Sequence, residues 1–187
     1  MTESLNPFEP YNPPKLTIEL VPFGQWFDNL RSRLKPGQWE VLKTACYVRA
    51  NHRCEICNGK GRKHPVECHE IWHFDDVNKI QKLTGLIALC PSCHRVKHIG
   101  NAQRMGLLAP TLKHLAKINE WPLHLAEAYA EVMMDQWAWR SRHIWTLNLD
   151  WLSCYDEYVR DASAAGREAL KSRVCATIAA SRETDTQ

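Results

Sequence analysis

Two CxxC pairs constrain this 187-residue chain more than any other feature of its sequence. Cys54 and Cys57 form the first pair, and Cys90 and Cys93 form the second. One such pair places two thiolates and nearby backbone N–H groups on one side of a tetrahedral zinc ion, and a second pair completes the shell. A redox site would need only one pair. The spacing therefore predicts a structural Zn²⁺ whose binding energy also contributes to folding.

The composition is that of a globular protein with one core and an appendage. The chain is 44% hydrophobic and 24% charged, which excludes disorder throughout, collagen-like repeats and coiled-coil fibres. No apolar run in the sequence approaches the about 18 residues that cross a bilayer, and the N-terminus lacks the pattern of a signal peptide. We therefore expect a cytoplasmic protein with no membrane contact, in which reduced cysteines favour metal binding over disulfides.

Local patterns divide the chain into five parts. Proline and polar residues without periodicity indicate a flexible leader, helical patterns precede and follow a cysteine-rich middle, and the end is polar. We expect a flexible leader over residues 1–15, an N-terminal strand with helices over 16–50, and a zinc-bound core over 51–105. We expect a C-terminal helical extension packed on that core over 106–181, and a frayed tail over 182–187.

Within these parts, alternation and helical spacing predict individual elements. We expect strands over residues 16–22, 65–72, 84–90 and 145–152. We expect helices over residues 24–34, 37–50, 91–100, 109–119, 122–143 and 160–181. Thr111 is a candidate cap for the helix over 109–119, and Val132 belongs to the apolar stripe of the helix over 122–143.

Three histidines are placed so that they could bind one ion. His94 and His98 are four residues apart on the helix predicted over 91–100, so they share a face of that helix. His69 lies in the strand predicted over 65–72. Three imidazoles that converge in this way would leave open coordination positions, which are typical of a catalytic metal site.

The segments CEIC, VECHEIW and LIALCPSCHRVKH together resemble the HNH endonucleases, also called ββα-metal or His-Me finger nucleases, in the form with a four-cysteine zinc. The resemblance covers roughly residues 50–100. It implies an α+β fold with a small zinc-clamped ββα-metal core flanked by N-terminal and C-terminal helices. It also implies a bacterial or phage type of DNA endonuclease that hydrolyses phosphodiester bonds by a single-metal mechanism, with Mg²⁺ or another divalent cation.

The resemblance assigns roles by position. His69, His94 and His98 correspond to ligands of the catalytic ion, and the four cysteines correspond to the structural zinc ligands. Glu70 stands where the family has a general-base histidine, so it is the predicted base. Gly85 stands where the family has the Asn that orients this histidine. A shift of one residue gives a second register, with His69 as the base and Cys68 or Glu67 near the metal.

The charge distribution fits a polyanion as the partner. Residues 31–119 carry sixteen Lys and Arg against six Asp and Glu, whereas the two flanking stretches are net acidic. This count fits a nucleic-acid footprint, although a solvated basic surface would give it as well. Six cations are the predicted contacts to a DNA backbone: Arg49, Arg53, Lys60, Arg62, Lys63 and Lys97.

A second function is compatible with the same residues. Loss of the base histidine and its Asn would also suit a catalytically degenerate HNH-fold zinc module that acts as a nucleic-acid-binding or protein-adaptor domain. Two protein partners are compatible with the sequence. Cutting both strands would favour a homodimer, and the C-terminal extension, with its acidic residues, could bind another protein.

Overall fold

The computed structural model describes residues 13–26, 30–35 and 37–155. Most of the predicted leader, the helix predicted over 160–181 and the predicted tail therefore lie outside the described residues, and the division into five parts stays a prediction. Among the helices that are described, none is long and apolar enough to cross a membrane.

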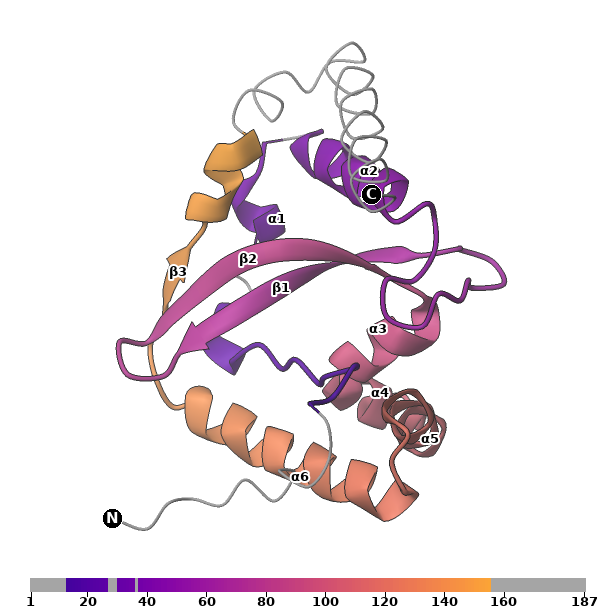
Figure 1. The fold of residues 1–187 in the computed structure, drawn as a ribbon. Helices are drawn as coiled ribbons and strands as arrows, with labels where there is room; N and C mark the ends of the chain where they lie inside the picture. Colours follow the sequence, from indigo (N-terminus) through magenta and orange to yellow (C-terminus); the bar gives the residue numbers. More distant parts are fainter. Residues whose placement is uncertain (1–12, 27–29, 36, 156–187) are drawn as a thin grey trace, which may run out of the picture.

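A long antiparallel hairpin forms the centre of the fold (Figure 1). Strand β1 (Glu67–Asp75) pairs with strand β2 (Ile80–Leu89), and a short strand β3 (Thr146–Asn148) runs parallel to the start of β2. The two long strands confirm two of the predicted strands. The protein is a mixed α+β fold with a three-stranded sheet in the order β1-β2-β3.

Helices lie on both sides of this sheet (Figure 1). On one side are α1 (Leu30–Arg33) and α2 (Gln38–Arg49), and α2 contacts both long strands. The residue before α2, Gly37, has a φ of 87°, a backbone conformation that glycine adopts without strain. Leu30, Leu42 and Leu83 are buried together in the core between these helices and the sheet.

Within the described residues, four helices follow β2 and build a second, larger core on the other side of the sheet. The chain turns into the first of them at Pro91, which suits a first helical position because its missing N–H would be unpaired there anyway. The helix predicted over 91–100 is in fact two helices, because His98 leaves the helical conformation with φ −105° and ψ 43°. The four are α3 (Pro91–Lys97), α4 (Ile99–Arg104), α5 (Leu108–Asn119) and α6 (Leu123–Arg140).

The strand predicted over 16–22 is wrong. Leu16 and Ile18 are buried in the larger core, but the segment pairs with no strand among the described residues. Its backbone is held instead by the side chain of Asn119, which bonds both the N–H and the C=O of Leu16 at 2.9 Å. The alternation therefore reports alternating burial of an extended segment against helices.

Three smaller predictions also need correction. Thr111 lies inside α5, where its hydroxyl donates to the Leu107 carbonyl at 2.7 Å, so it does not cap the helix. Val132 is 46% exposed and lies off the buried stripe of α6. The strand predicted over 145–152 is limited to β3 and continues as the 3-10 helix η2 (Asp150–Tyr155); a second 3-10 helix, η1 (Phe23–Gln25), precedes α1.

Candidate functional site

The four predicted zinc ligands come together beside the end of β2. The sulfur atoms of Cys54, Cys57, Cys90 and Cys93 all lie within 4.8 Å of one another, and those of Cys57 and Cys90 are 3.6 Å apart. Two ligands about 2.3 Å from one zinc ion at the tetrahedral angle lie about 3.8 Å apart. The cysteines therefore form a group that could hold one metal ion.

Hydrogen bonds attach the first cysteine pair to the sheet. The Cys54 N–H donates to the Gly59 carbonyl at 3.0 Å, and the Gly59 N–H points to the Cys57 sulfur at 3.4 Å. Glu55, inside the pair, donates its backbone N–H to the Ala88 carbonyl at 2.9 Å and accepts the Ala88 N–H at 2.7 Å. These bonds explain how two pairs that are distant in sequence meet at one point.

Hydrogen bonds within the group shift the pKa of three of these thiols. Hydrogen bonds from Cys90 and Cys93 hold the pKa of Cys54 far below its usual value. The bond to Cys54 raises the pKa of Cys90 to about 11, and the bonds to Cys54 and Cys90 raise the pKa of Cys93 as well. Three of the four cysteines are buried, and four cysteine sulfurs gathered at one point are the soft donor set that Zn²⁺ binds in structural sites.

His114, which was not predicted to bind a metal, lies next to this cluster. Its Nε2 on α5 lies 3.2 Å from the Cys93 sulfur. Burial lowers the pKa of His114, so the ring is neutral and can donate an N–H to the sulfur. Such outer contacts orient metal ligands. The two residues are 21 positions apart in sequence, beyond the reach of any local spacing rule.

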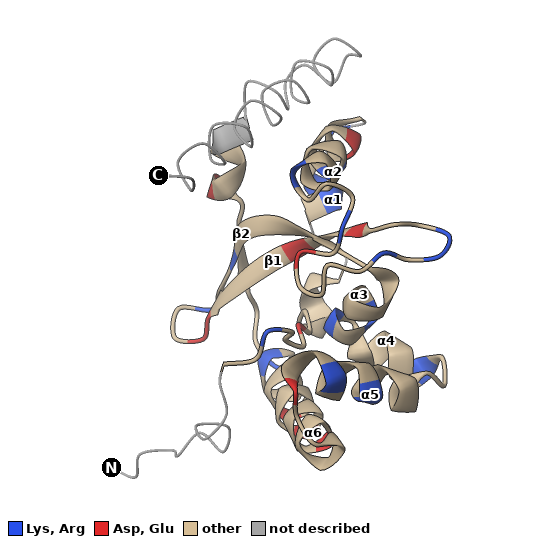
Figure 2. Ribbon diagram, turned by 45° about the vertical axis from the view of Figure 1, so that its right-hand side comes forward, with Lys and Arg blue, Asp and Glu red and all other residues tan. Residues whose placement is uncertain are grey.

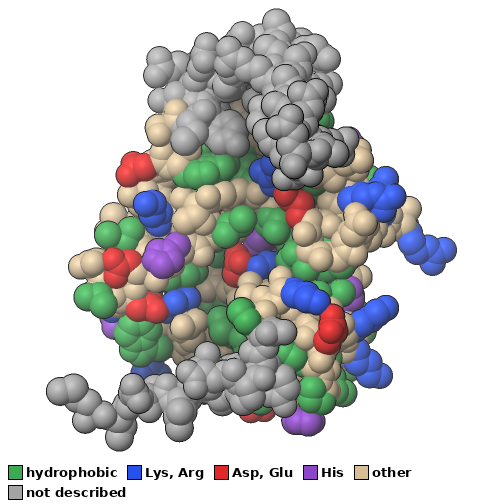
Figure 3. All heavy atoms as spheres, viewed as in Figure 1, with side chains coloured by type: hydrophobic (Ala, Val, Ile, Leu, Met, Phe, Trp, Pro, Cys, Tyr) green, Lys and Arg blue, Asp and Glu red, His purple; other side chains and the backbone are tan. Residues whose placement is uncertain are grey.

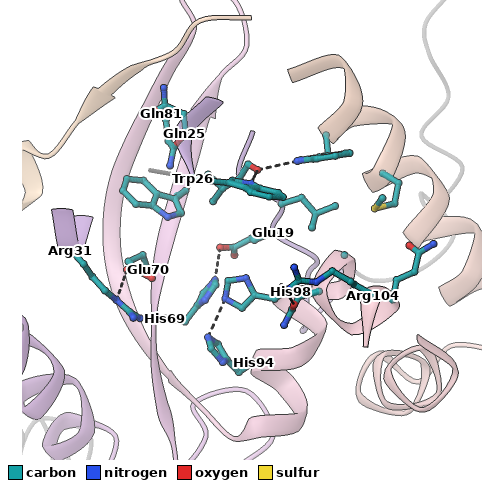
Figure 4. Close-up of a pocket in the computed structure, with 18 residues that line it drawn as sticks. Glu19, Gln25, Trp26, Arg31, His69, Glu70, Gln81, His94, His98 and Arg104 are labelled. Carbon is teal, nitrogen blue, oxygen red and sulfur yellow. Dashed lines mark hydrogen bonds and ion pairs between the residues drawn. The ribbon is translucent and has the colours of Figure 1, made fainter. Parts of the chain in front are cut away.

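The three predicted histidines also meet (Figure 4). One ring nitrogen from each of His69, His94 and His98 lies within 4.8 Å of the others, and Nε2 of His94 is 3.2 Å from Nε2 of His98. Two nitrogens about 2.1 Å from one ion at 90–109° lie about 3.0–3.4 Å apart. Burial, followed by the charges of the other two rings, lowers the pKa of His98 to about 3, so this ring is neutral, as a metal ligand must be.

A carboxylate orients one of these rings. Glu67 Oε2 is 2.5 Å from His94 Nδ1. Glu67 and His69 are two residues apart on β1 and therefore project from the same face of the strand. Because an ionised carboxylate only accepts hydrogen bonds, we place the His94 proton on Nδ1, which leaves its Nε2 lone pair free on the side of His98. Metal-binding histidines are commonly fixed by a carboxylate in this way.

Glu19, which the sequence did not single out, does the same for His69. Its Oε2 lies 3.2 Å from His69 Nε2, and its Oε1 lies 2.5 Å from Lys97 Nζ. Burial would raise the pKa of Glu19, but the His69 hydrogen bond and the Lys97 charge outweigh it and lower the pKa. We therefore place the His69 proton on Nε2. His69 Nδ1 is buried, has no hydrogen-bond partner among the described residues, and can hold a metal or accept a proton.

Glu70, the predicted base, has a different environment. Its Oε1 is 3.7 Å from Arg31 Nε, and the Glu70 side chain is 15% exposed. Successive strand residues point to opposite faces, and Figure 4 shows Glu70 turned to Arg31 while His69 is turned to Glu19. Glu70 still lines the same cleft as the histidines, so its role as the base stays a prediction.

The cleft beside the histidines has a volume of about 670 Å³, within the about 300–1,000 Å³ typical of ligand sites. Its wall is largely apolar and includes Trp26, Trp72 and Trp137, and two cations, Arg31 and Arg104, also line it. Figure 3 shows this face hollowed near its centre, where hydrophobic side chains lie next to acidic, basic and His side chains.

The cations predicted to contact DNA do not line this cleft within the described part of the chain. Lys97 is buried and bonded to Glu19 and Thr17, a placement that does not fit a contact with a DNA backbone. Arg49 bonds Glu55 at 2.8 Å and the Leu86 carbonyl at 2.6 Å, so it braces the first cysteine pair against β2. The other four are exposed and lie in the loop before β1: Arg53, Lys60, Arg62 and Lys63. Figure 2 shows Lys and Arg positions along this loop in blue.

Comparisons of the chain with protein-family models, with curated proteins and with solved structures give no match. The functional assignment therefore rests on the residues and the geometry described above.

Proposed function

We propose that the protein is a metal-dependent endonuclease of the HNH type that hydrolyses phosphodiester bonds in DNA. The observation that carries this proposal is the convergence of His69, His94 and His98 beside a cleft that also contains Arg31 and Arg104. Under this proposal the β1–β2 hairpin and α3 are the ββα core, and the four cysteines hold a structural zinc.

A divalent cation bound by the histidines would offset the negative charge that develops on the phosphate and the departing oxygen. The donor set bears on which cation this is. Imidazole nitrogens suit Zn²⁺, Fe²⁺ or Ni²⁺, whereas Mg²⁺ prefers oxygen ligands. We therefore propose a first-row transition-metal ion at the three histidines in preference to Mg²⁺.

The chain's own residues supply binding and proton transfer. Arg31 and Arg104 line the cleft and would orient a phosphate group there. Two residues are candidates for the base that takes a proton from water. His69 can use Nδ1, because Glu19 holds the other ring proton, and His94 and His98 would then hold the cation. Glu70 is the base if His69 binds the cation.

A specific observation also favours the alternative of a degenerate module. Gly85 pairs with Ile71 across the hairpin, and a glycine offers no side chain to orient a base on β1. The carboxylate of Glu70 is, in addition, engaged by Arg31. A protein of this kind would keep the zinc and the cleft and bind nucleic acid or protein without cutting.

Plasmid nicking tests the proposal. Supercoiled plasmid is incubated with the protein and Ni²⁺, Mn²⁺ or Mg²⁺, and His94→Ala is compared with His124→Ala, which removes an exposed histidine on α6. We expect metal-dependent nicking that only His94→Ala abolishes. Zinc-loaded, folded protein that nicks with none of the three ions would reject the nuclease and favour the adaptor.

The base is assigned by two further variants. If Glu70 is the base, Glu70→Gln should lower the nicking rate about 10²- to 10⁴-fold while metal binding at the histidines is kept. If His69 is the base, Glu70→Gln should stay active, and His69→Ala should lose activity while it still binds the ion through His94 and His98.

A further inference from the structure

We infer that the cleft accepts a single nucleobase that has left its base stack, so that the substrate is a nucleic acid with an unpaired or extruded nucleotide. This inference rests on the proposed nuclease function and names the substrate class of that site.

The first observation is a pair of buried amides in the wall of the cleft. Gln25 is 7% exposed and Gln81 is 1% exposed, and the Oε1 atom of each has no hydrogen-bond partner among the described residues. The orientation of Gln25 is fixed, because its Nε2 donates to the Trp145 carbonyl at 3.0 Å. An unpaired buried acceptor is unfavourable in a folded protein. Both oxygens are enclosed in the wall of the cleft, so a small movement of that wall would let a ligand with N–H donors pair them, and two such acceptors favour a ligand of this kind.

The second observation is the aromatic wall. Trp26 is 51% exposed, and Trp72 and Trp137 line the same cleft. Indole rings are the surfaces on which unstacked bases pack, because every base has a π-face. A nucleobase combines such a face with an edge that carries N–H groups. It therefore matches both the tryptophans and the two glutamine acceptors.

The third observation is the order of these groups along the cleft. In Figure 4, Gln25 and Gln81 are drawn at one end, His94 lies at the other, and Trp26 and Glu19 lie between them. A base held at the glutamine end would direct its phosphate to the histidines. A volume of about 670 Å³ leaves room for more than the base alone. A fully paired duplex keeps every base in its stack and cannot fill the cleft in this way.

Binding without cleavage tests this inference. Fluorescence anisotropy with no added divalent cation compares three labelled DNA duplexes, namely one with a single bulged adenosine, one with an abasic site at the bulge, and one fully paired. The abasic duplex has the same charge and the same backbone bulge but lacks the base. We expect the bulged adenosine to bind roughly 5- to 150-fold more tightly than the abasic bulge, the range of one stacked base.

Three variants locate the preference. Trp26→Ala and Gln81→Met should each reduce the preference for the bulged adenosine over the abasic bulge to less than about twofold. The control is Trp139→Ala, which removes an exposed tryptophan of α6 that does not line the cleft and should keep the preference. Gln81→Met replaces an unpaired buried acceptor by an apolar group of similar shape, so its melting temperature should not fall. Loss of the preference together with a lower melting temperature would mean that Gln81 is structural, and would overturn its assignment as a base contact.

The outcomes separate this inference from the proposed function. Plasmid nicking with equal affinity for the bulged and abasic duplexes would overturn the base site and leave the nuclease standing. A preference for the bulged base in a protein that never nicks would support the base site and reject the nuclease. Absence of any binding to the three duplexes would overturn the base site, and the nuclease would then be judged by plasmid nicking alone.

Discussion

The contact between Glu19 and Lys97 allows the framework of the site to be tested apart from its chemistry. The Lys97 ammonium lies 2.5 Å from Glu19 Oε1 and 2.7 Å from the Thr17 hydroxyl, and the Lys97 side chain is only 6% exposed. Glu19→Gln keeps the size of the side chain but removes its charge. The variant therefore leaves the Lys97 charge buried without its counter-charge.

The size of the effect follows from these contacts. Removing one member of a buried ion pair costs about 3–5 kcal/mol, and a hydrogen bond to a charged group contributes about 1.5–3 kcal/mol. The Thr17 hydroxyl and the new amide oxygen can still accept hydrogen bonds from Lys97. We therefore expect Glu19→Gln to lower the free energy of unfolding by about 2–3 kcal/mol. Adding Lys97→Met removes the unpaired charge and should restore at least half of that loss.

Urea denaturation of the wild type, the two single variants and the double variant measures the coupling. The decreases in the free energy of unfolding in Glu19→Gln and in Lys97→Met should add up to more than the decrease in the double variant, by at least about 1.5 kcal/mol. The matched control is Glu120→Gln, which breaks an exposed ion pair to Lys15 and should leave the free energy of unfolding unchanged within error. Additive losses for Glu19 and Lys97 would refute the reasoning.

Three further predictions concern the framework around the site. Cys93→Ser should lose zinc and unfold the core, because structural zinc supplies about 10–16 kcal/mol of apparent binding free energy; wild-type zinc content and melting temperature would contradict this. Gly61→Ala should lower the unfolding free energy by about 1–3 kcal/mol, because a Cβ there would lie 2.0 Å from a backbone oxygen. Gly24→Ala, whose Cβ would meet no described atom within 4 Å, is its control, and equal melting temperatures would refute the clash. Arg140→Lys should cost about 1–2 kcal/mol, because Arg140 makes two 2.8 Å bonds to Asp76, and an unchanged urea midpoint would exclude that role.

The two groups of candidate metal ligands were predictable because their signals are local. A CxxC pair and a histidine pair at i and i+4 each fix two ligands on one short element. The element types around them were predictable for the same reason: α3 begins at Pro91, and β1 and β2 contain the short segments 65–72 and 84–90 that were predicted as strands, apart from their end residues. The sequence could not predict how these elements come together in space. The hydrogen bonds between Glu55 and Ala88 show how the first cysteine pair is attached to β2.

The carboxylates of the site were harder to predict, and Glu19 shows why. It lies 50 residues from His69 and 78 from Lys97, so no periodicity links the three. Lys97 itself was predicted to contact DNA because it lies on the same helix as His94, and lysines are seldom buried. It is buried here because Glu19 balances its charge and the Thr17 hydroxyl accepts a hydrogen bond from it. Contacts between residues so far apart in sequence cannot be predicted from local sequence patterns.

The same long-range pairing bears on how much of the chain the site requires. The resemblance to HNH nucleases covers residues 50–100, and both predicted ligand sets lie within it. Yet the segment 13–26 contributes Glu19 to His69, and Gln25 and Trp26 to the cleft. That segment is anchored in turn by Asn119 of α5 and by a backbone bond from Glu19 to the Lys97 carbonyl. A fragment limited to the hairpin and α3 would keep the metal ligands but lose the group that sets the His69 proton and much of the cleft wall. The described N-terminal segment and the helices that hold it therefore belong to the candidate site as much as the hairpin and α3 do.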